Sequence, residues 1–105
     1  MTTQKDHDLA RHFTALSHPR RAMIFRLLAA SPESGRSFLR LQAATRLCES
    51  SLVHHLREME RCGLIYRRRK GSCVAYLLSP TGLAAALHDT LAISAQVQSP
   101  ARRAA

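Results

Sequence analysis

The side chains with the greatest capacity for chemical contact are cationic, and they gather in the middle of the chain. Nine Lys and Arg residues lie between positions 36 and 70, against three acidic ones: Arg36, Arg40, Arg46, Arg57, Arg61, Arg67, Arg68, Arg69 and Lys70. Over all 105 residues, 16 Lys and Arg stand against 7 Asp and Glu, which gives a formal charge of +9 and a pI near 11.0. Such an excess attracts a polyanion, with nucleic acid first among the candidates. We therefore expect the partner to contact this central segment.

A second group of candidates lies on one face of a helix predicted after Cys48. Leu52, Leu56 and Met59 recur at i, i+4 and i+7, so they face inward and the polar residues between them face outward or along the flank. The residues predicted to contact base edges or phosphates are Ser50, Ser51, His54, His55 and Arg57. Serine and histidine can donate or accept hydrogen bonds, whereas arginine suits guanine or phosphate. An ordinary solvated face is the alternative, and for His55, at the edge of the apolar stripe, half-buried packing is a further one.

A run of four cations follows in a strand-like segment. Side chains alternate across a strand, so Arg67 and Arg69 share one face and Arg68 lies opposite, but a protruding hairpin can present several of them to phosphates. The hairpin cations predicted to contact DNA are Arg67, Arg68, Arg69 and Lys70, and Arg36 and Arg40, near the start of the third predicted helix, are also predicted to contact it. The alternative is an edge strand whose cations only prevent unwanted strand pairing.

Helices must position these side chains, and the sequence predicts four of them before the strand-like segment. Apolar stripes and their flanking caps predict helices over 6–16, 19–30 and 37–46, followed by one that begins after Cys48 and stops at Gly63. Ser37 is expected to cap the third helix, which carries Phe38, Leu41 and Ala44 inward. Two short helices joined by a tight turn are typical of a helix-turn-helix.

The remainder of the chain predicts a hairpin and a last helix. Strand-like residues at 65–69 and 74–78 flank a turn, and Ser79 with Pro80 forms a cap-then-proline helix start. The last helix is apolar on more sides than so short a chain can cover, which predicts a dimer interface. The residues assigned to that interface are Leu9, Phe13, Leu83, Leu87 and Leu91. We expect a single domain over residues 1–97 and a disordered tail at 98–105.

The sequence lacks the motifs that are typical of several other function classes. No apolar run is long enough for a membrane span, and the polar first eight residues lack the apolar core of a signal peptide, so a cytoplasmic protein is expected. A glycine-rich phosphate loop, a Gly-x-Ser-x-Gly motif and a metalloprotease motif are all absent from the sequence. Only Cys48 with a histidine could form a nucleophilic pair, so we do not expect an enzyme.

Two sensing chemistries stay open as alternatives. Cys48 precedes the fourth helix, and because a helix N-terminus lowers a cysteine pKa, its oxidation is a candidate redox signal. Cys62 is expected to be a small core residue, and Cys73 lies on the second strand of the hairpin. Zinc or another divalent metal would have to use Asp8 and His12, together with His88 and Asp89 of a neighbouring chain. No cofactor is otherwise expected.

The element order and four local motifs resemble the ArsR/SmtB family of winged helix-turn-helix repressors over residues 9–92. The matching stretches are Leu16–Arg21, Ser50–Leu56, Gly63–Ile65 and Arg69–Ser72 before Tyr76. The resemblance implies that the fourth helix enters the major groove, that the hairpin reaches the flanking backbone, and that the first and last helices form a two-fold dimer. Leu39-Arg40-Leu41 stands where the family often has a Cys-x-Cys metal site, and Arg46 and Cys48 replace a turn glycine and a capping serine.

These observations together predict a mainly α winged helix-turn-helix protein, with about five helices and a two-stranded antiparallel hairpin. The expected function is that of a homodimeric, sequence-specific regulator of a double-stranded DNA operator, a repressor released by a signal. The thiol-based and metal-responsive regulators above are alternatives to this signal. A winged helix that binds protein or RNA is the alternative from a different class.

Overall fold

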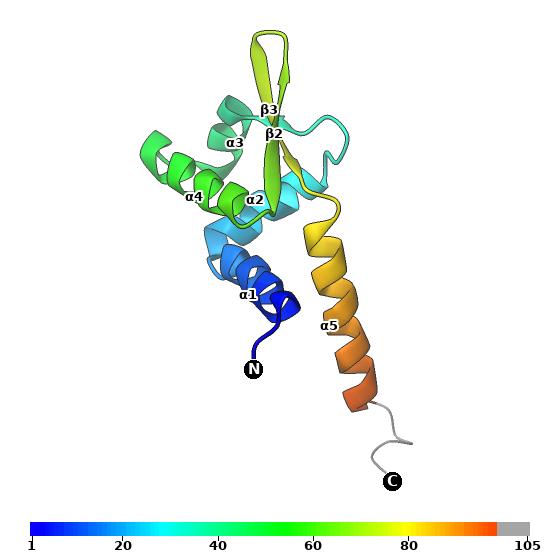
Figure 1. The fold of residues 1–105 in the computed structure, drawn as a ribbon. Coiled ribbons are helices and arrows are strands. Elements are labelled where there is room, and N and C mark those ends of the chain that lie inside the picture. Colours follow the sequence, from blue (N-terminus) through cyan, green and yellow to red (C-terminus); the bar gives the residue numbers. More distant parts are fainter. Residues whose placement is uncertain (99–105) are drawn as a thin grey trace.

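Five helices and a small antiparallel sheet make up the fold (Figure 1). The computed structural model describes residues 1–98, without the side chains of Leu83, Ala85, Ala86, Asp89 and Gln98. The elements are α1 (Gln4–Leu16), α2 (Pro19–Ala29), β1 (Arg36–Ser37), α3 (Phe38–Thr45), α4 (Glu49–Arg61), β2 (Ile65–Lys70), β3 (Cys73–Leu78) and α5 (Gly82–Gln98). The last helix therefore reaches Gln98, and residues 99–105 of the predicted tail lie outside the described residues.

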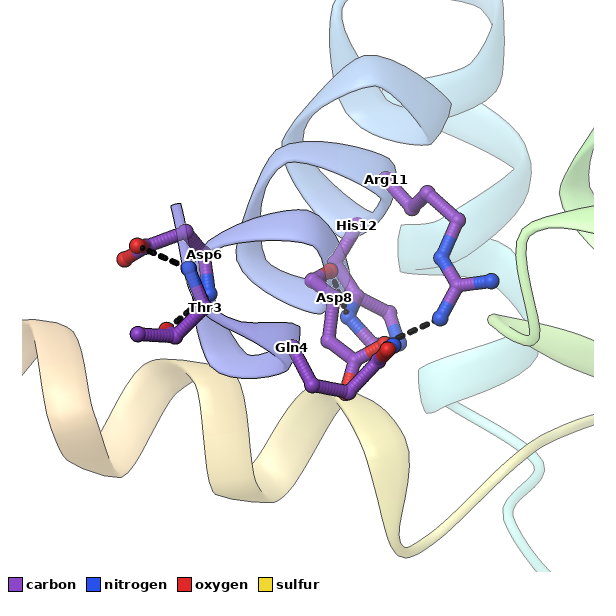
Figure 2. Close-up of polar contacts among 6 residues, drawn as sticks. All are labelled: Thr3, Gln4, Asp6, Asp8, Arg11 and His12. Carbon is purple, nitrogen blue, oxygen red and sulfur yellow. Dashed lines mark hydrogen bonds and ion pairs between the residues drawn. The ribbon is translucent and has the colours of Figure 1, made fainter. Parts of the chain in front are cut away.

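Local capping sets where the helices begin, and two starts differ from the sequence prediction. Helix α1 starts at Gln4 because Thr3 and Asp6 form a capping box, in which each side chain accepts a hydrogen bond from the other residue's backbone N–H (Figure 2). Helix α2 has Pro19 at its first position, as expected. Pro80 does not start α5, because it lies in a turn that delays the helix to Gly82.

The core forms where α2, α3 and α4 meet. The three apolar residues predicted to anchor α4, Leu52, Leu56 and Met59, are buried, and they cluster with Ile24, Leu28 and Leu41. Burying side chains of this size contributes roughly 1.5–3 kcal/mol each. The prediction for Ala44 is wrong, because that residue is exposed and Thr45 takes the inward position. The Thr45 hydroxyl donates to the Leu41 carbonyl at 2.7 Å, so its burial leaves no unpaired polar group.

The sheet has three strands in the order β1–β3–β2, one more than the sequence predicted. The hairpin of β2 and β3 is in the register Arg67↔Tyr76 and Lys70↔Cys73, and it protrudes from the helices as the wing (Figure 1). Strand β1 has only two residues, too few to show an alternating pattern, and it pairs with Tyr76 and Ala75 at the base of the wing. The third strand therefore attaches the start of α3 to the wing.

The turn between α3 and α4 completes the helix-turn-helix. Arg46 ends α3 in the left-handed conformation with φ 60°, where glycine is usual because a side chain is disfavoured there. Leu47 enters the core, and Cys48 is the N-cap residue of α4. The chain thus keeps the tight turn with an arginine at a position where glycine is usual.

Helices α1 and α5 pack beside each other, and α5 extends away from the rest of the fold (Figure 1). Large apolar side chains on these helices are exposed: Phe13 by 47%, Leu87 by 42%, Leu91 by 68% and Ile93 by 58%. Leu9 is half-buried, and the side chain of Leu83 lies outside the described residues. An apolar surface of this kind on neighbouring helices is typical of a protein interface.

Gly35 precedes β1 and should tolerate no larger residue. Its φ is +67°, and an added Cβ would lie 2.4 Å from the backbone oxygen of Tyr76. We expect Gly35→Ala to lower the free energy of unfolding by about 3 kcal/mol or more, because left-handed strain and a backbone clash add together. The measurement is urea denaturation followed by circular dichroism.

Gly71→Ala is the matched control, because Gly71 has φ +63° and open space around its Cβ position. Only the strain applies there, so the expected loss is about 1–2 kcal/mol. Equal losses in the two variants would contradict the close approach at Gly35.

Candidate nucleic-acid interface

The outward face of α4 presents most of the residues that the sequence predicted for it. Ser50, His54 and Arg57 are exposed and Ser51 is half-buried, while the inward stripe anchors the helix. Glu49, Ser50, Val53, His54 and Arg57 line a shallow hollow on this face. The face offers hydroxyl, imidazole and guanidinium groups, which match the donors and acceptors at base edges and phosphates.

His55 does not belong to that face, and its assignment to DNA contact was wrong. The residue is only 5% exposed, and its ring accepts a hydrogen bond at Nδ1 from the Nε of Arg21, at 3.1 Å. The ring centroids of His18 and His54 lie 4.7 Å and 5.7 Å from that of His55. Packing was the open alternative at the edge of the apolar stripe, and the structure supports it. His55 ties α4 to the start of α2.

The wing carries its cations on two faces, as alternation requires. Arg67 pairs with Glu60 of α4, with 3.1 Å between Nε and Oε1. Arg68 points the other way and donates to the backbone carbonyl of Glu33 at 2.8 Å. Arg69 and Lys70 are exposed towards the tip. The base of the wing is therefore held by polar contacts, and its tip is available to solvent.

A groove between α4 and the wing brings predicted residues of both elements together. Arg57 and Arg61 of α4, Arg67 of β2 and Tyr76 of β3 all line it. Burial raises the pKa of the Tyr76 hydroxyl, while the positive charge of Arg67 opposes that rise. Tyr76 thus stays a neutral hydrogen-bonding group in a groove lined by guanidinium groups.

The two remaining predicted cations lie near the start of α3. Arg40 is exposed in the first turn of that helix. Arg36 is half-buried on β1, and its Nε is buried without a hydrogen-bond partner among the described residues. Arg40 is free to reach a partner, whereas Arg36 is constrained by the sheet.

Cys48 is exposed at the N-cap of α4, and its Sγ lies 3.5 Å from the hydroxyl of Ser50. The hydrogen bond with Ser50, followed by one from the Ser51 backbone, lowers the pKa of the Cys48 thiol. The lowered pKa agrees with the expected effect of a helix N-terminus, and the redox role stays a prediction. Cys62 is half-buried against the core and Cys73 is exposed.

The side chains suggested for a metal site already have other partners (Figure 2). The Asp8 carboxylate accepts from Gln4 and Arg11, and these contacts lower its pKa. His12 is buried and donates from Nδ1 to the Asp8 carbonyl at 2.7 Å. Among the described residues, no three His, Cys, Asp or Glu side chains are placed to hold a metal ion, and the side chain of Asp89 lies outside them.

Sequence reasoning missed three residues that shape the interface. Glu60 pairs with an arginine of the wing, and His18 and Arg21 surround His55. Arg21 and His55 are 34 residues apart, so no periodicity relates them. The signal available in the sequence was that Glu60 and Arg21 are charged residues on helices predicted to carry core stripes.

Comparison with solved structures decides the fold. An ArsR-like transcriptional regulator from Rhodococcus sp. RHA1 superposes with a TM-score of 0.77 at 22% identity, covering 90% of this chain and 86% of that one. The chain has the winged helix-turn-helix fold. A homodimeric winged helix-turn-helix DNA-binding domain from Mycobacterium bovis matches with a TM-score of 0.66 at 22% identity, covering 94% and 92% of the two chains. HlyU from Vibrio cholerae N16961 matches with a TM-score of 0.69 at 24% identity, covering 90% and 100%.

The winged-helix neighbours include an ArsR family transcriptional regulator and an ArsR-like transcriptional regulator. No protein-family model matches the chain, and no curated protein matches it in sequence. None of the helices within residues 1–98 combines the length and the hydropathy needed to cross a membrane.

The histidine packing of this winged helix predicts a loss of stability in acid. Burial first, and then the positive charges of His18, Arg21, His54 and Arg20, lower the pKa of His55. In the unfolded chain, where the histidine pKa is near 6.5, His55 therefore binds a proton more readily than in the folded chain. Stability from this group is complete above about pH 6.5 and falls as the pH drops below it, so the thermal midpoint should decrease from pH 7.5 to pH 5.5.

The His55→Gln variant should show a smaller decrease over the same pH range, measured by circular dichroism at constant ionic strength. His7→Gln is the control, because His7 is exposed in the first turn of α1. An equal decrease in wild type and His55→Gln would show that His55 is not the responsible group.

Proposed function

We propose that the chain is a dimeric, sequence-specific DNA-binding transcriptional regulator of the ArsR type, and not an enzyme. One observation carries this proposal: Arg57 of α4 and Arg67 of the wing line the same groove, while Ser50 and His54 are exposed on the same helix as Arg57. A helix with a polar outward face, flanked by a cationic hairpin, suits the major groove and the adjacent backbone. In this proposal α4 is the recognition helix.

Each part of this surface has its own task in the proposal. Ser50 and His54 contact base edges, Arg57 contacts guanine or a phosphate, Ser51 contacts the backbone at the flank, and Arg69 and Lys70 at the wing tip contact phosphates. Arg40 reaches the backbone from the start of α3. The protein acts on DNA in the cytoplasm as a repressor that a signal releases from its operator.

Loss of the Arg57 guanidinium should weaken DNA binding. With a duplex from the chain's own promoter region at moderate salt, Arg57→Ala is expected to raise Kd by about 5- to 100-fold, which corresponds to roughly 1–3 kcal/mol. Fluorescence anisotropy against the promoter duplex and a random duplex of equal length measures both affinity and specificity.

Arg11→Ala is the matched control, because it removes the same group from α1, where Arg11 is exposed and pairs with Asp8. Its effect on Kd should stay below about twofold, since screening removes most of the influence of a distant charge. Wild-type protein that binds promoter and random DNA equally would overturn the sequence-specific function. Equal losses in the two variants would overturn the role of Arg57.

The second part of the proposal is a two-fold dimer formed through α1 and α5. Phe13, Leu87, Leu91 and Ile93 are exposed by 42% to 68% on two helices that pack together, which is a large apolar surface for so small a chain. A second copy of the chain covers both helices by presenting the same surface. The dimer would set two recognition helices about 34 Å apart, to match one turn of DNA.

A charge on that apolar surface should separate the two protomers. Leu91 is 68% exposed, so Leu91→Asp is not expected to disturb the fold of one chain. Multi-angle light scattering should report a mass near 11.7 kDa for the variant and twice that value for wild type.

Leu39→Asp is the control for this experiment, since Leu39 is 74% exposed on α3 and away from the proposed interface. This variant should remain dimeric. A monomeric wild type, or a Leu91→Asp dimer, would overturn the assignment of the interface.

A further inference from the structure

The groove between α4 and the wing is lined by three arginines and has room for an anion. Its volume is about 540 Å³, and it is lined by guanidinium groups from two elements together with Tyr76. Arg57 and Arg61 come from α4 and Arg67 from β2, so an anion seated there would be contacted from two sides. Arginine groups bind phosphate strongly because their N–H donors match its oxygens.

One carboxylate interrupts this cationic lining. Glu60 lies in the groove with its side chain 28% exposed, and its Oε1 is 3.1 Å from the Nε of Arg67. Arg61 is paired as well, but its partner is Glu58, with 2.6 Å between the atoms. Within the described part of the chain, Arg57 has no carboxylate partner. The one acidic side chain in the groove therefore engages the only cation that the wing contributes to it.

We propose that this groove is a phosphodiester site for the DNA backbone, and that Glu60 competes with the DNA phosphate for Arg67. The proposal rests on the DNA-binding function proposed above. When DNA is absent, Glu60 neutralises Arg67. When a backbone phosphate enters, Arg67 exchanges the carboxylate for a phosphate oxygen, and the remaining charge of Glu60 repels the phosphate.

The competition is expected to lower the affinity for all DNA sequences alike. A phosphate is the same at every base sequence, so the competition lowers affinity for promoter and random DNA by similar factors. It also lowers the salt dependence, because the Glu60 carboxylate that Arg67 leaves takes up a cation, which offsets one of the cations released from the DNA. Glu60 thus limits how long the protein stays on any duplex, without choosing between sequences.

Removal of the Glu60 charge tests the proposal. Glu60→Gln should lower Kd for the promoter duplex and for a random duplex by about two- to fivefold each, as expected for a partly exposed ion pair. The slope of log K against log salt concentration should become steeper by about 0.9, because no freed carboxylate then takes up a cation when DNA binds. Fluorescence anisotropy at several salt concentrations measures both quantities.

Two further variants make the result specific to the pair. In an Arg67→Ala background, Glu60→Gln should give less than half of its single-variant gain, because the competition needs both partners. Asp8→Asn is the matched charge control, since it also removes a carboxylate from an Arg pair, on α1 at the opposite side of the molecule from the wing tip (Figure 1). It should leave Kd unchanged.

The outcomes separate this inference from the function on which it rests. Wild-type protein that binds no DNA would overturn the proposed function itself. Wild-type protein that binds DNA, with a Glu60→Gln affinity that is unchanged, lowered, or raised equally in the Arg67→Ala background, would overturn only the competition.

Discussion

The burial of one side of α4 is the constraint on which the rest of the structure depends. A helix of 13 residues has little stability in isolation, so α4 must be held by packing. Leu52, Leu56 and Met59 supply that packing against α2 and α3, and His55 adds a polar tie to Arg21. The polar face can keep a fixed orientation only because the opposite face is anchored in the core. Any change in that core would therefore also alter what α4 presents to a partner.

The wing and α4 form one charged surface although they differ in secondary structure. The Glu60–Arg67 pair connects them directly, and β1 connects the base of the wing to the start of α3. These connections set the relative position of the cationic hairpin and the polar outward face of α4. The ion pair within the protein thus fixes the arrangement of charged groups that a charged partner would contact.

The sequence predicted the fold well where periodicity carries the information. The stripe of Leu52, Leu56 and Met59 defined α4, and alternation correctly separated Arg68 from its neighbours. The sequence prediction failed where the deciding contact joins residues far apart in the chain, or where the element is very short. Strand β1 has two residues and no period, and the side on which His55 lies depends on Arg21, a residue of another helix. The Glu60–Arg67 pair likewise exists only after the helix and the hairpin have been placed together.

The turn at Arg46 has a consequence for how this protein can change. A non-glycine residue in the left-handed conformation costs roughly 1–2 kcal/mol, which other contacts of the fold must offset. Buried neighbours such as Leu47 and Thr45 hold the turn in place despite that cost. A replacement at position 46 that avoids this cost would therefore raise the free energy of unfolding. Destabilising changes elsewhere, including new side chains on α4, could be tolerated after such a replacement, so the turn is a position from which binding preference can diversify.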